Sequence, residues 1–291
     1  MTVPDEAREV RRDEPHTPEA AGDGYALGYS APTIEQRFER LDGMSRSPAA
    51  GLLAVEVPVA LVYNARPHAV MMCTPADLED FAVGFTVSEQ IATAAEIRRI
   101  EVVKYARGIE LQIEVRADVA DRLTDRTRAM VARTGCGLCG VEVIEGAMRS
   151  PEPVRSTLVV SRDALWRAAE LLGSGQSLNR DVNAIHAAAW ATADGEVRVT
   201  REDVGRHNAL DKVIGALTRA GLDASRGFGL VTSRASYELV QKAAATNLPL
   251  LAAVSRPTAL AVRLADDAGI TLVGLLRGTS GNVYTHPERV S

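Results

Sequence analysis

Residues 228–276 have the sequence FGLVTSRASYELVQKAAATNLPLLAAVSRPTALAVRLADDAGITLVGLL, in which two kinds of segment alternate. The short apolar segments FGLVTS, LPLLAAVS and ITLVGLL are typical of buried strands. The segments SYELVQKAAAT and PTALAVRLADDAG between them have the length and apolar spacing of helices. Strands that alternate with helices of this length predict a mostly parallel sheet that is covered by helices.

The same alternation extends towards the N-terminus. HAAAWA and EVRVT are two further expected strands, and ALDKVIGALTRAG is the helix that follows them. SRDALWRAAELLG predicts a helix with Ser161 as its N-cap and Gly173 at its end. We therefore expect an α/β core in the C-terminal half of the chain.

The first half of the chain has a different pattern, which predicts a smaller α+β subdomain. VPVALVYN with HAVMMC, and IEVVKYA with IELQIEV, are two expected β-hairpins. A helix is expected in TPADLEDFAVGFTVSEQI. There Thr74 would cap the helix, Pro75 would take its first position and Asp77 would complete a capping box.

These patterns divide the chain into four parts. Residues 1–45 are expected to be a disordered N-terminal extension, because the first residues carry mixed charge and no apolar stretch, and regular structure is expected from about Leu52. Residues 46–133 would form the α+β subdomain, and residues 134–150 a glycine-rich cysteine loop and linker. Pro151 and Pro153 interrupt the chain where the α/β domain of residues 151–291 is expected to begin.

The composition excludes several classes of protein. With 291 residues, 46% apolar and 24% charged, the chain is long enough for one large or two medium globular domains. The net charge of −5 provides no basic field for nucleic acid or acidic lipid. The three cysteines are too few for a disulfide scaffold and suit a reducing compartment. No apolar run resembles a signal peptide or a membrane span, so we expect a cytoplasmic protein.

The loop TGCGLCG at residues 134–140 is the sharpest local feature, because it places Cys136 and Cys139 among three glycines. Glycines on either side leave both sulfurs accessible, which favours a thiol that reacts or carries sulfur. A zinc site and a pair of small buried residues remain alternatives, although no second pair of ligands has zinc-site spacing. Cys73 follows an apolar strand and is expected to be a buried structural thiol.

Arginines follow each of the expected parallel strands. In open α/β sheets, ligands bind beyond the carboxyl ends of the strands, where the N-termini of helices favour phosphate. Four arginines in register at one edge would suit a polyphosphate or dinucleotide. The residues at these strand ends are Arg206, His207, Ser233, Arg234, Ser255, Arg256 and Arg277.

Two histidines and two aspartates near these strand ends have more than one possible role. His207 could contact the same anion, act as an acid or base, or make a local hydrogen bond at a helix start. His186 is expected to be a hydrogen-bonded core histidine. Asp203 and Asp211 could orient arginines or contact a ribose or base, although most acidic residues on such helices are only solvated.

These motifs together resemble the FdhD family of formate dehydrogenase accessory sulfur-carrier proteins. The resemblance covers roughly residues 50–291 and rests on TPADLEDFAVGF, TGCGLCG, HAAAW, REDVGRHNALDKVIG, TSRASYELVQKAA and the terminal NVYTHPERV. It implies a cytidine deaminase-like α/β core, although the His-x-Glu and Pro-Cys-x-x-Cys motifs of zinc deaminases are absent, so deaminase chemistry is not expected.

The resemblance also implies a function. Such proteins are usually homodimers that receive persulfide sulfur from a cysteine desulfurase. They pass it to the bis-molybdopterin guanine dinucleotide form of the molybdenum cofactor before that cofactor enters formate dehydrogenase. The persulfide-bearing cysteine of the family falls on Cys136, and the second cysteine of the loop on Cys139. The cofactor-binding stretch falls on Leu275, Leu276, Arg277, Gly278, Thr279 and Ser280.

The resemblance, together with the accessible cysteine loop, therefore implies a sulfurtransferase that acts through a persulfide on Cys136, and no metal of its own is expected. Two other functions remain possible. One is a non-catalytic chaperone that binds the molybdenum cofactor or a guanine nucleotide and whose cysteines are incidental. The other is a small zinc-binding interaction module.

Overall fold

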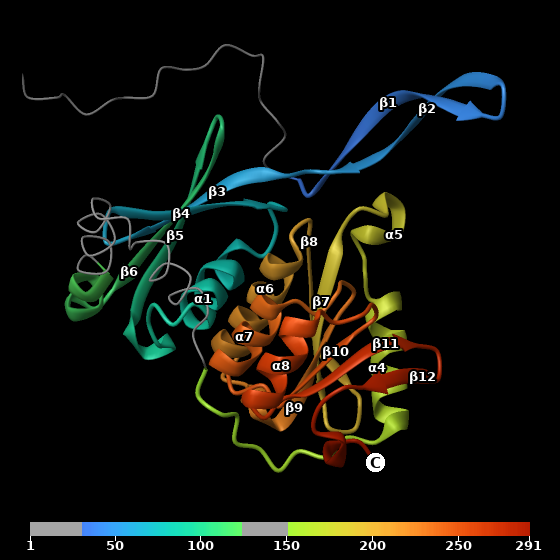
Figure 1. The fold of residues 1–291 in the computed structure, drawn as a ribbon. Coiled ribbons are helices and arrows are strands. Elements are labelled where there is room, and N and C mark those ends of the chain that lie inside the picture. The colour runs from blue at the N-terminus through green and yellow to red at the C-terminus, as the bar shows by residue number, and fades with distance from the viewer. Residues whose placement is uncertain (1–30, 124–150) are drawn as a thin grey trace, which may run out of the picture.

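A computed structural model describes residues 31–123 and 151–291 of the chain (Figure 1). These residues form a six-stranded sheet, a four-stranded sheet and a separate two-stranded hairpin, with helices packed on the two larger sheets. The expected α/β fold class is confirmed.

The six-stranded sheet belongs to the C-terminal half of the chain. Its strands are β7 (His186–Thr192), β8 (Val197–Asp203), β9 (Gly227–Val231), β10 (Leu250–Ala253), β11 (Thr271–Arg277) and β12 (Ser280–Val283), in the spatial order β12-β11-β10-β9-β7-β8. Strand β10 is parallel to both β9 and β11, whereas β7 is antiparallel to β8 and β9, and β12 is antiparallel to β11. The sheet is therefore mixed rather than mostly parallel in its pairing, but β8, β9, β10 and β11 all point in one direction.

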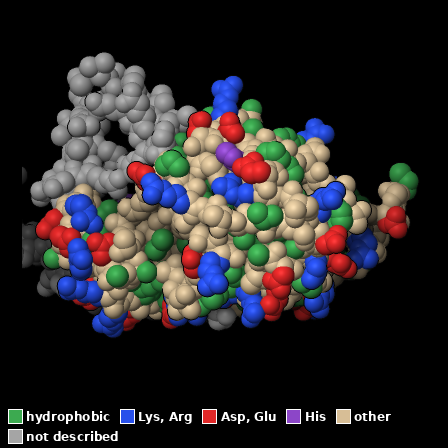
Figure 2. Space-filling model, turned by 90° about the horizontal axis from the view of Figure 1, so that it is seen from below, with side chains coloured by type: hydrophobic (Ala, Val, Ile, Leu, Met, Phe, Trp, Pro, Cys, Tyr) green, Lys and Arg blue, Asp and Glu red, His purple; other side chains and the backbone are tan. Residues whose placement is uncertain are grey.

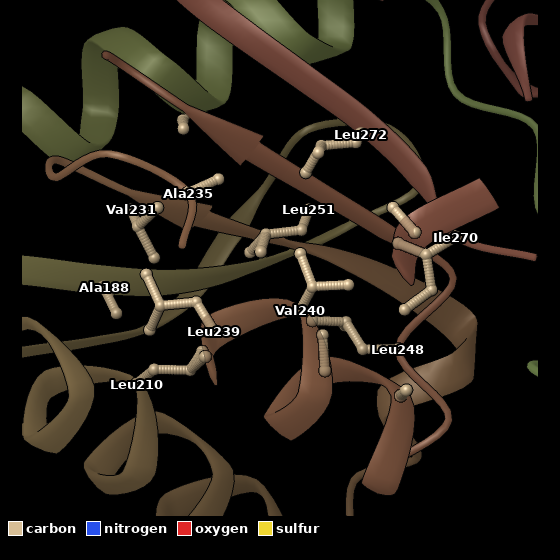
Figure 3. Close-up of a cluster of buried hydrophobic side chains, with 14 of the residues drawn as sticks. Ala188, Leu210, Val231, Ala235, Leu239, Val240, Leu248, Leu251, Ile270 and Leu272 are labelled. Carbon is tan, nitrogen blue, oxygen red and sulfur yellow. The ribbon is translucent and has the colours of Figure 1, made fainter. Parts of the chain in front are cut away.

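Helices cover both faces of this sheet, as the alternation of strands and helices predicts. The helices α6 (Arg206–Arg219), α7 (Tyr237–Ala245) and α8 (Ala259–Asp267) pack on one face, and α4 (Arg162–Ser174) packs on the other. In β10, Leu251 packs with Leu210 and Leu239 on the first face (Figure 3), while its neighbour Leu250 packs with Leu172 on the second. Because full burial of a leucine side chain contributes roughly 1.5–3 kcal/mol, both layers stabilise the sheet.

The four-stranded sheet belongs to the N-terminal half. Its strands are β3 (Val57–Tyr63), β4 (Arg66–Cys73), β5 (Ile97–Tyr105) and β6 (Gly108–Val115), in the order β4-β3-β6-β5. The pairs β3–β4 and β5–β6 are antiparallel, which confirms both expected hairpins. Helix α1 (Leu78–Ser88) covers the inner face, where Phe81 and alternate residues of β6 are buried. The described residues also include the short helices η1 (Ala94–Glu96), α5 (Asn179–Val182), η2 (Ala224–Arg226) and η3 (Pro287–Arg289) and a helical segment at 117–123.

The start of α1 differs from the expected capping box. The helix begins at Leu78, and Asp77, its N-cap residue, has a left-handed backbone with φ of 52° and makes no side-chain cap. Thr74 serves the tertiary structure instead. Its backbone N–H donates to Asp203 Oδ2 at 3.0 Å, and its Oγ1 accepts from the backbone N–H of Val204 at 3.1 Å. A long-range contact has therefore replaced the local one.

Helices α1 and α6 join the two halves of the molecule through an unusually close crossing. A Cβ atom on Gly84 would lie 1.7 Å from the carbonyl oxygen of Asp211, and one on Gly215 would lie 1.8 Å from that of Asp80. Only glycine permits this approach of backbone to backbone. Around the crossing, the buried Asp80 carboxylate pairs with the guanidinium of Arg201 at 2.7 Å.

The N-terminal boundary of regular structure also differs from the expectation. Strands β1 (Thr33–Asp42) and β2 (Ser45–Ala54) form an antiparallel hairpin, so regular structure is already present before Leu52 and includes residues 33–45 of the expected disordered extension. Residues 1–30 lie outside the described part of the chain. The hairpin exposes both of its faces, so its sequence lacks the apolar alternation that marks a half-buried strand. Gly43, the first of the two turn residues Gly43 and Met44, has a φ of 58° and is the signal that could have revealed it.

Candidate functional site

The carboxyl ends of β8, β9, β10 and β11 lie at one edge of the six-stranded sheet, because these strands point in the same direction. An arginine follows or ends each strand: Arg206 after β8, Arg234 after β9, Arg256 after β10 and Arg277 at the end of β11. The topology thus places the four arginines that the sequence singles out at one edge. We refer to this part of the molecule as the strand-end edge.

Backbone hydrogen bonds hold the neighbouring strand ends together. The N–H of Val254 donates to the carbonyl of Val231 at 3.0 Å, which joins the ends of β10 and β9. The N–H of Leu275 donates to the carbonyl of Ser255 at 3.1 Å, which joins β11 to the loop after β10. The Nε of Arg277 donates to the carbonyl of Val254 at 3.2 Å, so this guanidinium is tied to the neighbouring strand end.

His207 lies in the first turn of α6 and faces the start of α7. Its Nε2 is 2.5 Å from Glu238 Oε2 and 3.3 Å from Ser236 Oγ. Burial of the ring and the nearby Arg206 guanidinium lower the pKa of His207, although Glu238 acts in the opposite direction. Because a carboxylate can only accept, the Nε2–H of His207 donates to Glu238, and in the neutral ring Nδ1 is an acceptor. Ser236 and Glu238 belong to the TSRASYELVQKAA motif, but their contacts with His207 depend on how α6 and α7 pack and could not be predicted from the sequence.

Arg206 is the arginine of this edge that reaches furthest into the protein. Its Nε is buried and has no hydrogen-bond partner among the described residues. A buried donor without a partner costs roughly 1–3 kcal/mol, which favours a ligand at this position. The half-buried His186 lies nearby at the start of β7, and burial, followed by the Arg206 charge, lowers its pKa. His186 is thus at the strand-end edge and not in the core, contrary to the expectation from sequence.

The residues matched to the cofactor-binding stretch form the hairpin between β11 and β12. Arg277, Gly278, Thr279 and Ser280 are exposed, and Gly278 has a φ of 54°, which suits a tight turn. Leu275 is partly exposed, but Leu276 is packed in the core on the α4 face of the sheet. The exposed residues of this hairpin are therefore the ones that can reach a ligand.

The serines and the two middle arginines occupy loops beside this hairpin. The hydroxyl of Ser233 is buried and donates to the carbonyl of Arg234 at 3.0 Å. Ser255 is half-buried, whereas the side chains of Arg234 and Arg256 are exposed. Both guanidinium groups are therefore accessible to an anionic molecule at this edge.

A buried ion pair supports the loop that carries Arg206 and His207. Lys212 Nζ lies 2.6 Å from Asp203 Oδ2, and both side chains are fully buried. The other oxygen of Asp203 accepts from the backbone N–H of Gly205 at 2.8 Å and from the amide of Asn208 at 3.0 Å. Asp203 thus fixes the β8–α6 loop and does not face a ligand. The roles of Lys212 and Asn208 cannot be predicted from the sequence, because their burial against Asp203 depends on tertiary packing.

The cysteines have separate positions. Cys73 is fully buried, and burial raises the pKa of its thiol, which confirms the expectation of a structural thiol. Cys136 and Cys139 lie in residues 124–150, outside the described part of the chain. Within residues 31–123 and 151–291, no group of three or more His, Cys, Asp or Glu side chains is arranged to hold a metal ion. No helix in those residues is long and apolar enough to span a membrane.

One open cavity of about 390 Å³ lies elsewhere, on the outer face of the four-stranded sheet. Its walls come from all four strands of this sheet and the turn after β3, and they include Arg99 and Glu101. The cavity is therefore distinct from the strand-end edge. The arginines, the buried Nε and the backbone geometry favour the edge as the place where an anionic ligand binds.

Comparison with known proteins agrees with this reading of the fold. The family model described as the FdhD/NarQ family matches residues 54–291. The chain is 52% identical over 259 residues to sulfur carrier protein FdhD of Xanthomonas euvesicatoria, covering 89% of this chain and 92% of that protein. It is also 52% identical over 274 residues to sulfur carrier protein FdhD of Cupriavidus necator, covering 94% of each chain.

A solved structure shows the same fold. The formate dehydrogenase accessory protein from Desulfotalea psychrophila superposes with a TM-score of 0.70 at 23% identity, covering 89% of this chain and 99% of that chain. The family match extends over most of the sequence and includes both sheets and the cysteine loop. This chain belongs to the FdhD/NarQ family.

Proposed function

We propose that this chain is a sulfur carrier that accepts sulfur as a persulfide and delivers it to a molybdenum cofactor destined for formate dehydrogenase. The observation that carries the proposal is its 52% identity, over 89% and 94% of its length, to two proteins named sulfur carrier protein FdhD. The fold that it shares with a formate dehydrogenase accessory protein supports the same recipient.

Cys136 is the proposed acceptor of sulfur. Its thiolate attacks the terminal sulfur of a persulfide on a cysteine desulfurase, so that a new S–S bond forms at Cys136. The S–S bond of the donor breaks and the donor cysteine leaves as a thiolate. The S–S bond at Cys136 later breaks, its electron pair stays on Cys136 as the thiolate, and the sulfur passes as a neutral atom to the cofactor substrate, whose reduced metal would supply the two electrons that bring it to the sulfide level. Cys139 either carries sulfur, resolves the persulfide or shapes the loop.

The strand-end edge is the proposed site for the cofactor, which is bound as a substrate in its bis-molybdopterin guanine dinucleotide form. That molecule carries two pyrophosphate groups, and arginine forks bind phosphate oxygens in pairs. Arg206 supports this assignment because its buried Nε lacks a partner among the described residues. Arg234, Arg256 and Arg277 are exposed at the same edge and supply further positive charge. His207 stands beside Arg206 in the first turn of α6, at the same edge.

The setting of this reaction follows from the same resemblance. We propose that the protein works in the cytoplasm, where its thiols stay reduced, and that it acts as a homodimer. Its partners would be the cysteine desulfurase that supplies sulfur and the formate dehydrogenase that receives the cofactor.

Complementation separates this function from that of a cofactor chaperone with incidental cysteines. In a bacterial strain that lacks its own sulfur carrier protein, the chain should restore formate dehydrogenase activity, and Cys136→Ala should not. Cys73→Ala is the matched control, because Cys73 is buried and distant in sequence from the loop. Full activity with Cys136→Ala would support the chaperone and contradict the sulfur carrier.

A further inference from the structure

The β1–β2 hairpin exposes an unusual share of apolar side chains. Fifteen large apolar side chains are exposed in the described residues, and six lie on this hairpin and its turn: Ile34, Phe38, Leu41, Met44, Leu52 and Leu53. On the face of the molecule shown in Figure 2, apolar side chains are scattered among charges of both signs. A hairpin of two strands is only marginally stable alone in water. An exposed apolar hairpin that projects from the body therefore needs a partner (Figure 1).

Only one edge of the hairpin is open to another strand. Gly43 and Met44 form a two-residue turn, which makes Asp42 and Ser45 a hydrogen-bonded pair. Along the hairpin from this pair, non-hydrogen-bonded and hydrogen-bonded pairs alternate. Pro48, opposite Glu39, then falls in a non-hydrogen-bonded pair, and its nitrogen points away from β1. The outer edge of β2 thus lacks a donor at its centre. The short helix α5 (Asn179–Val182) also contacts β2.

The outer edge of β1 has no such block. By the same alternation, the backbone N–H and C=O groups of Thr33, Glu35, Arg37, Glu39 and Leu41 point away from β2. No backbone partner for these groups occurs among the described residues. A row of free donors and acceptors of this kind is a template for another strand.

We infer that β1 pairs in antiparallel orientation with β1 of a second copy of this chain. The two-fold axis of this dimer lies between the two copies of Phe38, which stand opposite each other. The product is a four-stranded sheet in the order β2-β1-β1-β2, which crosses between the two chains. This inference deepens the homodimer of the proposed function, because it names the surface through which the two copies join.

The register follows from the requirement that paired residues lie on the same face of the sheet. The two-fold axis must then lie midway between the two copies of one residue of β1. Two positions of the axis, at Arg37 and at Phe38, pair nine of the ten residues of each strand. An axis at Arg37 places Arg37 opposite itself and Glu35 opposite Glu39, so like charges meet. An axis at Phe38 places Arg37 opposite Glu39 twice and brings the two phenyl rings together. The second register is complementary in both charge and apolar surface.

Two other readings of the same residues are weaker. Charged side chains often protect natural edge strands from pairing. Here they do not, because in the proposed register each Arg37 stands opposite a Glu39 of the second copy. A third register, with its axis at Gln36, places Glu35 opposite Arg37 and is also complementary. It pairs only seven residues of each strand, so it buries less of the hairpin.

Cross-linking tests the axis directly. In a full-length Cys136→Ala/Cys139→Ala background, Phe38→Cys should form a disulfide-linked dimer under mild oxidation. Opposed residues of a non-hydrogen-bonded pair have Cα atoms about 4.5 Å apart, within disulfide range. Gln36→Cys is the matched control, because its two copies would lie about 13 Å apart in this register. Efficient linking of Gln36→Cys, and not of Phe38→Cys, would overturn the assignment.

Charge reversal tests the pairing without cysteines. In sedimentation equilibrium, Glu39→Arg should raise the dissociation constant of the dimer about tenfold, because two pairs of like charges then meet. The double variant Arg37→Glu/Glu39→Arg should return it to within about threefold of the wild type. Both variants lose the exposed Glu39–Arg46 contact of 3.3 Å, so the loss of that contact does not contribute to the difference between them. Glu35→Arg is the control, because it faces Leu41 of the second copy in this register.

The outcomes separate this inference from the proposed function. A wild-type protein that is monomeric at micromolar concentration would overturn the pairing and the homodimer together. A dimer that is unaffected by Glu39→Arg and gives no Phe38→Cys link would overturn the pairing alone. Sulfur loading of Cys136, measured on the same variants, is an independent readout, since the proposed persulfide step does not use β1.

Discussion

Lysine is rare in this chain, and its positions are informative at the scale of single residues. Thirty of the 33 basic residues are arginine, and the three lysines are Lys104, Lys212 and Lys242. Lys212 is fully buried against Asp203, and Lys242 is nearly buried, with Nζ 3.0 Å from Asp211 Oδ1. Lys212 Nζ also donates to the backbone carbonyls of Thr74 at 3.0 Å and Glu202 at 3.3 Å, so its three donors all have acceptors. Two of the three lysines therefore serve in buried ion pairs.

Loss of the buried ammonium group should be costly. Lys212→Met leaves the Asp203 carboxylate buried without its partner and should lower the free energy of unfolding by about 3–5 kcal/mol. Urea unfolding, followed by circular dichroism, measures the change. Lys104→Met is the matched control: this lysine is exposed, and the change should stay within about 0.5 kcal/mol. Equal changes in the free energy of unfolding for the two substitutions would show that the buried ion pair does not stabilise the fold.

The half-buried histidines predict a pH dependence. The pKa values of His186 and His207 are lowered from 6.5, mainly by burial, so the unfolded chain binds protons more readily than the folded one. Stability should therefore rise with pH up to about the ordinary histidine value and decline as the pH falls below it. Thermal unfolding between pH 5 and pH 7.5 measures this slope. His207→Gln should flatten it, and an unchanged slope would contradict burial of His207 in its neutral form.

At the scale of elements, the crossing of α1 and α6 holds the two halves of the molecule together. A methyl group at Gly84 would overlap the carbonyl oxygen of Asp211, so Gly84→Ala must separate the helices. We expect it to lower the free energy of unfolding by at least about 3 kcal/mol. Gly173→Ala in α4 is the control, because nothing lies within 4 Å of its added Cβ, and it should stabilise by roughly 0.5–1 kcal/mol. Similar results for both would refute the close crossing.

The strand ends give a prediction about ligand binding. If Arg206 binds a phosphate group of the cofactor, Arg206→Ala should weaken binding of GDP, used as a probe for one guanine nucleotide arm, by about tenfold. Isothermal titration calorimetry gives the dissociation constant. Arg226→Ala is the matched control, because Arg226 directly precedes β9 and so lies at the opposite end of that strand. An equal loss with both variants would indicate an effect of net charge and not of a site.

At the scale of the whole molecule, the sequence predicts the strands and helices of the C-terminal half well. Each of these elements buries an apolar face, so the spacing of apolar residues along the sequence shows which side of the element is buried. The sheet is mixed because β7 and β12 are antiparallel to their neighbours, and direction cannot be read from apolar spacing. The β1–β2 hairpin escapes prediction for the opposite reason, since it buries almost nothing within its own chain.

The candidate site, too, is only partly predictable from the sequence. The strand-end arginines follow from sequence, because each stands directly after a recognisable strand. The partners that position them do not, because Asp203, Lys212 and Asn208 come together with Thr74 only after the two halves pack. The cysteine loop is assigned from its motif and from the family, and it lies outside the described residues.

The central claim, that Cys136 carries sulfur, is tested most directly by intact mass. The purified full-length chain is incubated with a cysteine desulfurase and cysteine, and its mass is measured before and after addition of a reductant. We predict a gain of one sulfur atom that the reductant removes and that Cys136→Ala abolishes. Retention of the same gain in Cys136→Ala, or no gain in the wild type, would contradict the account.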